Sequence, residues 1–122
     1  MISFERFEAA DGLPIYQQIV IYIKRGIAAG TVAHGDELPS RRVLSALLGI
    51  NPNTVQKAYR ILEDEGLILS QTGAKSTVAL SEDTVEQVRS QLLEHDARHL
   101  VGAMKQLGLT KDQAVALLET YW

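Results

Sequence analysis

Prolines and glycines divide the first 80 residues of this chain into short segments, each with its own apolar spacing. Between Pro14 and Gly30, isoleucines recur at four-residue steps from Ile15 to Ile27, the spacing of one face of an α-helix. Proline suits the first position of a helix, and glycine suits the residue just past its end. The segment is therefore predicted to be an amphipathic helix of about four turns with Pro14 as its first residue.

A polar stretch, TVAHGDELPS, follows this helix and is predicted to be a loop. Gly35 and Asp36 form a turn pair within it, and Pro39 interrupts any continuing helix. Ser40 is a preferred N-cap residue, and Gly49 is a preferred residue after a helix end. A second helix is therefore predicted between them.

A third helix is predicted from Asn51 to Glu65. Asn51 can cap it, Pro52 suits its first turn, and Gly66 follows its end. The runs LILSQ and STVAL come next and are rich in residues that favour strands, with the glycine-bearing TGAK between them. Three helices followed by a β-hairpin are therefore expected within one small domain.

Two further helices are predicted after residue 80. Asp83 with Glu86, and Thr110 with Gln113, have the spacing of a capping box, so each pair is expected to start a helix. Apolar residues recur at helical spacing along both segments, and the tail has no other element to cover them. A large exposed apolar patch usually marks a partner surface, and a homodimer is the simplest partner.

The residues expected in the dimer interface are Leu92, Leu93, Leu100, Met104, Leu107, Leu118 and Tyr121, with Trp122 beside them. The expected fold is mainly α with a small β-hairpin. It comprises a first domain over residues 1–80, with three helices and the hairpin, and a two-helix C-terminal dimerisation region over residues 81–122.

The third predicted helix has two opposed faces at 100° per residue. Its apolar face carries Val55, Ala58, Tyr59 and Leu62, and its polar face carries Asn53, Gln56, Lys57 and Arg60. Asparagine, glutamine, lysine and arginine match the donor and acceptor patterns of bases in a major groove. Three acids, Glu63 to Glu65, stand at the C-terminal end and oppose the helix dipole, which fits a helix whose N-terminal turns meet DNA. An ordinary solvated face is the alternative for a helix considered alone.

The order of these elements is that of a winged helix-turn-helix, and the sequence itself points to one family. The stretch GDELPSRRVLSALLGINPNTVQKAYRILEDEGLI resembles the DNA-binding domain of the GntR family of bacterial transcription regulators. PIYQQIVIYIKRGIAAG and INPNTVQKAY resemble its YtrA-type subfamily most closely, and the resemblance covers residues 13–79. It implies a winged helix-turn-helix that contacts operator DNA as a dimer.

The resemblance implies DNA contacts at the start of the second helix, along the third helix and at the hairpin tip. The residues concerned are Ser40, Arg41, Arg42, Asn51, Asn53, Thr54, Gln56, Lys57 and Gly73. Lys75, beside the tip, is expected to reach the minor groove or a phosphate. The sequence departs from the family pattern twice: Arg41 stands where many relatives have glutamate or another residue, and Ser76 replaces a glycine of the hairpin tip.

Each of these residues has a simpler alternative role. Arg42 could pair with the acids of the Asp36–Glu37 loop, and the Asn51 side chain could be occupied as a helix cap. Lys75 could serve solubility at a hairpin tip. Arg60 lies one turn further from the N-terminal end of its helix, where backbone contact or solvation is as consistent with its position as base contact.

Composition limits the remaining classes of function. The net charge is −3, with eight Lys/Arg and eight Asp/Glu in residues 1–80 but four and seven in residues 81–122. A neutral first part can still present a local basic stripe to phosphates. There is no cysteine, no leader-like start and no apolar run of the ~18–20 residues that a bilayer needs. We therefore expect a soluble cytoplasmic protein without a membrane partner.

Neither a metal site nor catalysis is expected. His95 and His99 have helical i, i+4 spacing near Asp96, but no third ligand motif accompanies them, and an interfacial role is the commoner one. No nucleophile, base and orienting residue stand in a recognisable order, so the chain is not expected to be an enzyme or to hold a cofactor.

The function expected from the sequence is that of a dimeric repressor on a palindromic operator, in a family whose members often control neighbouring transporter operons. The sequence identifies no small-molecule effector. The alternative is a winged-helix module that binds proteins and not DNA, which the net negative charge favours. An interaction surface would carry aromatic or aliphatic anchors, and the polar face of the third helix has none.

Overall fold

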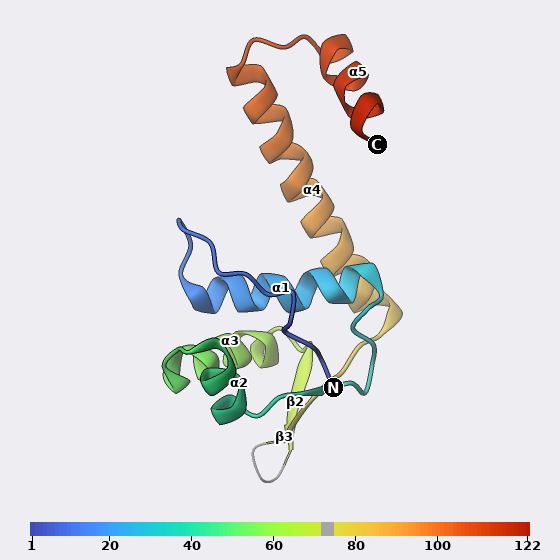
Figure 1. Cartoon of the computed structure of the whole chain (residues 1–122). Coiled ribbons are helices and arrows are strands. Elements are labelled where there is room, and N and C mark those ends of the chain that lie inside the picture. Colours follow the sequence, from blue (N-terminus) through green and yellow to red (C-terminus); the bar gives the residue numbers. More distant parts are fainter. Residues whose placement is uncertain (72–74) are drawn as a thin grey trace. The chain divides into compact units, whose positions relative to one another are not determined.

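The computed structural model describes residues 1–71 and 75–122, which form two compact units over residues 1–89 and 90–122 (Figure 1). The helices are α1 (Ile15–Ala29), α2 (Arg41–Leu48), α3 (Pro52–Asp64), α4 (Glu82–Gln106) and α5 (Lys111–Tyr121), and the strands are β1 (Glu37–Leu38), β2 (Ile68–Gln71) and β3 (Lys75–Val78).

Local capping determines where α2 and α3 begin. The Ser40 hydroxyl accepts a hydrogen bond from the Val43 amide at 3.1 Å, and the Asn51 side-chain oxygen accepts one from the Asn53 amide at 2.8 Å. Gly49, with φ of 67°, ends α2 in the left-handed conformation that glycine tolerates best. Both predicted caps are confirmed.

The start of α1 differs slightly from the prediction. Pro14 was expected to be the first helical residue, but it occupies the N-cap position, because its ψ of 145° is extended. Its carbonyl accepts from the Gln17 and Gln18 amides at 3.1 and 3.2 Å. The helix therefore begins one residue later, at Ile15.

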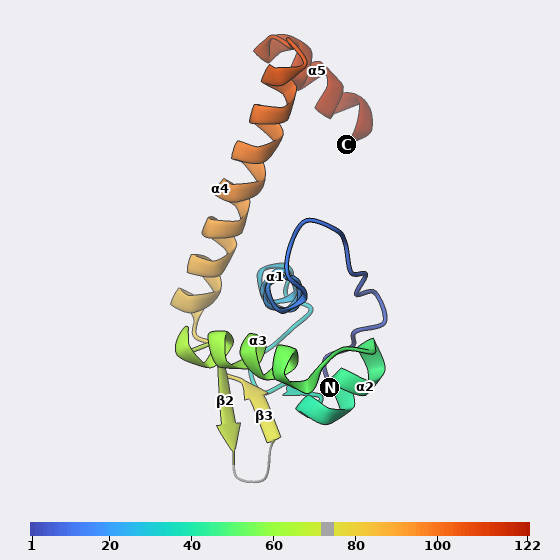
Figure 2. The same cartoon turned by 90° about the vertical axis from the view of Figure 1, so that its left-hand side faces the viewer.

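The wing is a three-stranded antiparallel sheet in the order β1-β3-β2. Ile68 pairs with Val78 and Gln71 with Lys75 in the predicted hairpin. The prediction of an unbroken loop before α2 is wrong, because Glu37 and Leu38 form the short strand β1 opposite Thr77 and Ser76. Figure 2 shows the β2–β3 hairpin extending away from α3.

The core of the first unit lies between α1 and α3, which pack against each other (Figure 2). Ile19 and Ile23 of α1 and Leu62 of α3 are completely buried. Burying one such side chain contributes about 1.5–3 kcal/mol relative to leaving it exposed. The predicted winged helix-turn-helix, mainly helical with a small sheet, is confirmed.

One hydrogen bond inside this core is open to a direct test. The buried Tyr59 hydroxyl donates to the Pro39 carbonyl oxygen at 2.7 Å, and burial raises the pKa of Tyr59 well above its ordinary value. Tyr59→Phe leaves that carbonyl without its donor, so the free energy of unfolding in urea should fall by about 1–3 kcal/mol. Tyr22→Phe is the matched control, because Tyr22 donates to Ser3 at the same 2.7 Å but in an exposed setting. Equal losses in the two variants would contradict the buried role.

The first turns of α4 belong to the first unit. Val88 is buried there, and the Arg89 guanidinium donates to the Ala28 carbonyl at 3.2 Å. The prediction that Asp83 and Glu86 cap this helix is wrong. The Ser81 hydroxyl accepts from the Thr84 amide at 3.2 Å, and the Thr84 hydroxyl accepts from the Ser81 amide at 2.9 Å. The helix α4 therefore begins at Glu82, two residues before the start that a cap at Asp83 would give. The domain boundary proposed after residue 80 stays a prediction.

The second unit comprises the rest of α4 and α5. Thr110 accepts from the Gln113 amide at 3.2 Å, and Gln113 accepts from the Thr110 amide at 2.9 Å. This predicted capping box is confirmed. Residues 90–122 are all described, and none of them is buried.

Candidate nucleic-acid interface

The α3 helix presents the two faces that its sequence predicts. Val55, Ala58 and Tyr59 are completely buried, whereas Asn53, Gln56, Lys57 and Arg60 are exposed. Thr54 is half-buried, and its amide bonds to the Asn51 carbonyl at 2.9 Å. The exposed side chains therefore project from a helix whose other face packs against α1 and α2.

The Asn51 side chain caps α3, which is the alternative to DNA contact that the sequence offered for this residue. Its side-chain oxygen is used by the Asn53 amide, so only its side-chain NH₂ group is left to donate outward. The N-terminus of α3 also carries the positive end of the helix dipole, which favours an anion such as phosphate. The first turn of α3 can thus attract a phosphate and, at the same place, expose the Asn53 side chain to a ligand.

At the start of α2, Ser40 and Arg42 have different surroundings. The Ser40 hydroxyl caps the helix, whereas the Arg42 side chain is exposed and makes no ion pair among the described residues. The alternative role for Arg42, an ion pair with Asp36 or Glu37, does not occur in the structure, and both of these acids have other partners. Glu37 pairs with Lys75 at 2.8 Å, and Asp36 accepts from the Ala33 amide at 2.8 Å.

Lys57 is oriented by an aromatic ring. Its ammonium nitrogen lies 4.1 Å from the centroid of the Tyr16 ring on α1. A cation over a ring face is stabilised by about 0.5–1 kcal/mol at an exposed site. The contact therefore restricts the Lys57 ammonium group to a small set of positions at the surface. The sequence did not reveal this contact with Tyr16.

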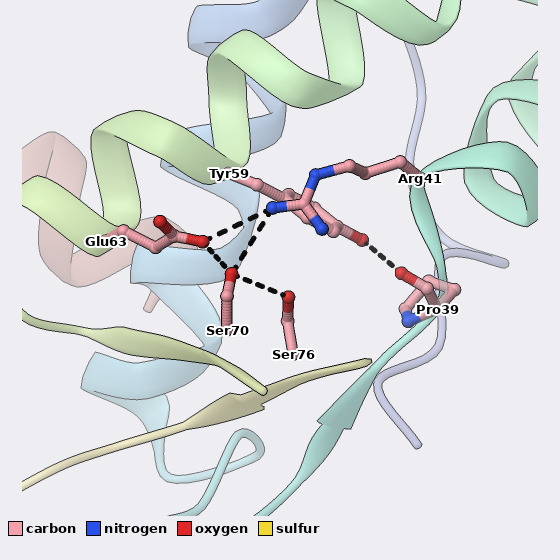
Figure 3. A network of polar contacts seen from close by, with 6 residues as sticks. All are labelled: Pro39, Arg41, Tyr59, Glu63, Ser70 and Ser76. Atoms are coloured by element: carbon pink, nitrogen blue, oxygen red, sulfur yellow. Dashed lines mark hydrogen bonds and ion pairs between the residues drawn. The ribbon is translucent and has the colours of Figure 1, made fainter. Parts of the chain in front are cut away.

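Arg41 lies in a different environment from its neighbour. Its guanidinium is 3.3 Å from the Glu63 carboxylate and 3.4 Å from the Ser70 hydroxyl, and its central carbon is 5.2 Å from the Tyr59 ring centroid (Figure 3). The sequence assigned no partner to this charge. The available clue was the surplus of acids at the end of α3, which called for cations nearby.

Those acids have structural partners. Glu63 pairs with Arg41, and Glu65 pairs with Lys24 of α1 at 2.8 Å. The unfavourable position of both carboxylates at the C-terminal end of α3 is thus offset by cations from neighbouring helices. These ion pairs explain the position of Glu63 and Glu65 without DNA. The acids at the end of α3 are therefore not the evidence for DNA binding that the sequence had suggested.

The hairpin contributes Lys75 to the same unit. Its ion pair with Glu37 connects β3 to β1, and the hydrogen bond and charge of Lys75 lower the pKa of the Glu37 carboxyl. A lowered folded-state pKa means that the pair is intact above the ordinary carboxyl pKa and is lost as the pH falls through the folded-state value. Gly73, the predicted tip residue, lies outside the described residues.

The two tail histidines lie close together. The ring centroids of His95 and His99 are 4.7 Å apart on α4. Within residues 1–71 and 75–122, no three side chains of histidine, cysteine or acidic type come together as metal ligands. In the same part of the chain, no helix is both long and apolar enough to cross a membrane.

Comparison with known proteins agrees with this geometry. Residues 15–78 match the family model described as bacterial regulatory proteins, gntR family. The HTH-type transcriptional repressor YtrA of Bacillus subtilis is 35% identical over 114 residues, which cover 93% of this chain and 83% of that protein.

Solved structures show the same fold. A GntR family transcriptional regulator from Listeria monocytogenes superposes with a TM-score of 0.81 at 32% identity, over 92% of this chain and 98% of that one. The DNA-binding domain of AraR, in complex with operator ORX1, superposes with a TM-score of 0.52 at 27% identity, over 60% of this chain and 88% of that one.

Proposed function

Because the chain belongs to the GntR family of DNA-binding bacterial transcription regulators, we propose that it is a repressor that binds a palindromic operator as a homodimer. The observation that carries the proposal is the exposed face of α3. Asn53, Gln56 and Lys57 project from its first turns, with the exposed Arg42 at the start of α2. Recognition helices contact bases with their N-terminal residues, and arginine contacts phosphates well.

Each predicted site residue has a defined part in this proposal. Asn53, Gln56 and Lys57 contact base edges or nearby phosphates, and Arg42 contacts the backbone. Ser40, Asn51 and Thr54 shape the helix starts that approach the DNA, and Lys75 and the hairpin tip with Gly73 reach the adjacent minor groove. Arg41 supports this surface from within.

The repressor assignment is supported by the similar YtrA protein, which is named a repressor. A cytoplasmic location follows from binding bacterial DNA. Control of a transporter operon rests on the family resemblance alone, and the effector is unassigned.

Homodimerisation is supported by the apolar surface of the second unit. Leu93, Leu100 and Leu107 are 58%, 42% and 79% exposed. With Ala97 and Met104 between them, these residues alternate in steps of four and three, the spacing of a coiled-coil seam. Water contact with so many apolar side chains is unfavourable, and a second copy of the same helix would cover them.

The remaining predicted interface residues extend this surface. Leu92 and Met104 are half-buried in the second unit, and Leu118 and Tyr121 of α5 are 41% and 83% exposed. Trp122 is also exposed. A two-fold dimer can place two α3 helices in successive major grooves, with half-site centres about 34–36 Å apart.

Fluorescence anisotropy tests the DNA-binding part of the proposal. Wild-type protein should bind the DNA upstream of its own gene more tightly than a scrambled duplex of the same composition, at matched salt. Specific complexes are typically at least ~10³-fold tighter than non-specific ones. Equal affinity for the two duplexes would favour the alternative, a winged-helix module for protein partners.

The Lys75–Glu37 ion pair yields one prediction at the hairpin. Glu37→Gln removes a carboxylate that competes with phosphate for Lys75, so DNA affinity should rise, by up to about fivefold, because an exposed pair is worth at most ~1 kcal/mol. Glu119→Gln in α5 removes the same charge in the second unit and is the control. A rise of equal size in both variants would assign the effect to net charge and not to Lys75.

A further inference from the structure

A network of polar side chains connects α2, α3 and both strands of the hairpin (Figure 3). Arg41 of α2 contacts Glu63 of α3 at 3.3 Å and Ser70 of β2 at 3.4 Å. The Ser70 hydroxyl donates to Glu63 and lies 3.5 Å from the Ser76 hydroxyl of β3. The Arg41 guanidinium thus joins α2 to α3 and β2, and the pair of serine hydroxyls extends the network to β3.

The network lies partly inside the protein. Ser76 is buried, and the side chains of Arg41 and Glu63 are 21% and 32% exposed. The Arg41 Nε is buried without a hydrogen-bond partner among the described atoms, and such a group is costly unless other contacts hold it. The contacts with Glu63, Ser70 and the Tyr59 ring supply that compensation.

Two residues of this network stand at the positions where the sequence departs from the pattern that the family resemblance implies. Arg41 and Ser76 are the two departures noted in the sequence, and the structure brings both to the Ser70 hydroxyl. A glutamate at position 41 would face the Glu63 carboxylate and repel it. A glycine at position 76 would provide no hydroxyl. The two departures are therefore parts of one arrangement.

We propose that Arg41 is a positioning residue for DNA binding, which fixes the β2–β3 hairpin against α2 and α3. This inference rests on the proposed DNA-binding face. A two-stranded hairpin has little stability of its own, and β1 adds only two residues to it. Holding the hairpin in place before binding reduces the conformational freedom lost on binding DNA.

Glu63→Ala distinguishes positioning from direct contact, because the two roles predict opposite results. If Arg41 contacted DNA itself, removing Glu63 would free its guanidinium and remove a negative charge, so binding would tighten. If Arg41 positions the hairpin, loss of its anchor should weaken operator binding on the order of fivefold, the equivalent of one hydrogen bond. The measurement is anisotropy with operator DNA.

Glu65→Ala is the matched control for this experiment. It removes the same charge near the same end of α3, where Glu65 pairs with Lys24 of α1 at 2.8 Å. Operator affinity should be unchanged or slightly higher in this variant. Urea unfolding of both variants shows whether each remains folded at the assay temperature.

Exchanging the charges of Arg41 and Glu63 provides the second test. This test compares two variants with each other, so it does not depend on the stability of one variant alone. Arg41→Glu should weaken operator binding about tenfold or more, and adding Glu63→Arg should recover a large part of that loss by restoring the pair. Tighter binding by Glu63→Ala, or a double variant as weak as Arg41→Glu, would overturn the positioning role. Wild-type protein with no preference for operator DNA would instead overturn the proposed function, and this inference with it.

Discussion

Leu100→Glu is expected to convert the proposed dimer into a monomer and to weaken binding to a two-half-site operator by about 100-fold or more. Leu100 is 42% exposed at the centre of the apolar seam, between Leu93 on α4 and Leu107, which directly follows the end of that helix. A carboxylate at this position would be buried in the seam beside the same carboxylate of the second copy. Burying two like charges in an apolar coiled-coil seam is strongly unfavourable. A monomer contacts one half-site and loses the effective concentration that joins the second half-site to the first.

Gln91→Glu is the control for this variant. Gln91 is exposed on the opposite face of the same helix at 100° per residue, so the new charge is equal and its position is the only difference. Light scattering should give a dimer mass for wild type and Gln91→Glu, and a monomer mass for Leu100→Glu. A Leu100→Glu protein that stays dimeric with full operator affinity would exclude this seam as the interface.

Arg42→Ala is expected to weaken binding about tenfold on operator and scrambled DNA alike, as a lost phosphate contact does. The slope of log affinity against log salt concentration should become shallower by about 0.9. Arg42 is exposed and makes no ion pair among the described residues, so its removal breaks no ion pair in the described fold.

Arg98→Ala removes a guanidinium from the second unit, where Arg98 pairs with Glu94 at 2.8 Å. It should leave the affinity and the salt slope unchanged. The same anisotropy titration at several salt concentrations measures both variants. An unchanged slope in Arg42→Ala would show that the residue does not contact a phosphate.

Features that depend on neighbouring residues could be predicted from the sequence. Ser40 and Asn51 satisfy amides two or three residues away, and Gly49 ends α2 by its own conformation, so these boundaries follow from local chemistry. The buried and exposed faces of α3 followed from helical periodicity in the same way. The α4 start was missed because Ser81, and not Asp83, occupies the cap.

Features that depend on residues distant in the sequence could not be predicted from it. The strand β1 exists because Glu37 and Leu38 pair with Thr77 and Ser76, a partnership that the two residues alone do not indicate. Likewise, the partners of Arg41 are 22 and 29 residues away, on elements whose packing must be known first. The sequence located the candidate DNA-binding face but not the side chains that support it.

Selection of bound sites from a pool of random DNA by the wild-type protein tests the central claim most directly. If two α3 helices read DNA from a symmetric dimer, the enriched sequences should be inverted repeats with half-site centres about one helical turn apart, roughly 10–10.5 base pairs. A pool that shows no enrichment, or that yields single half-sites without symmetry, would contradict sequence-specific binding by a dimer.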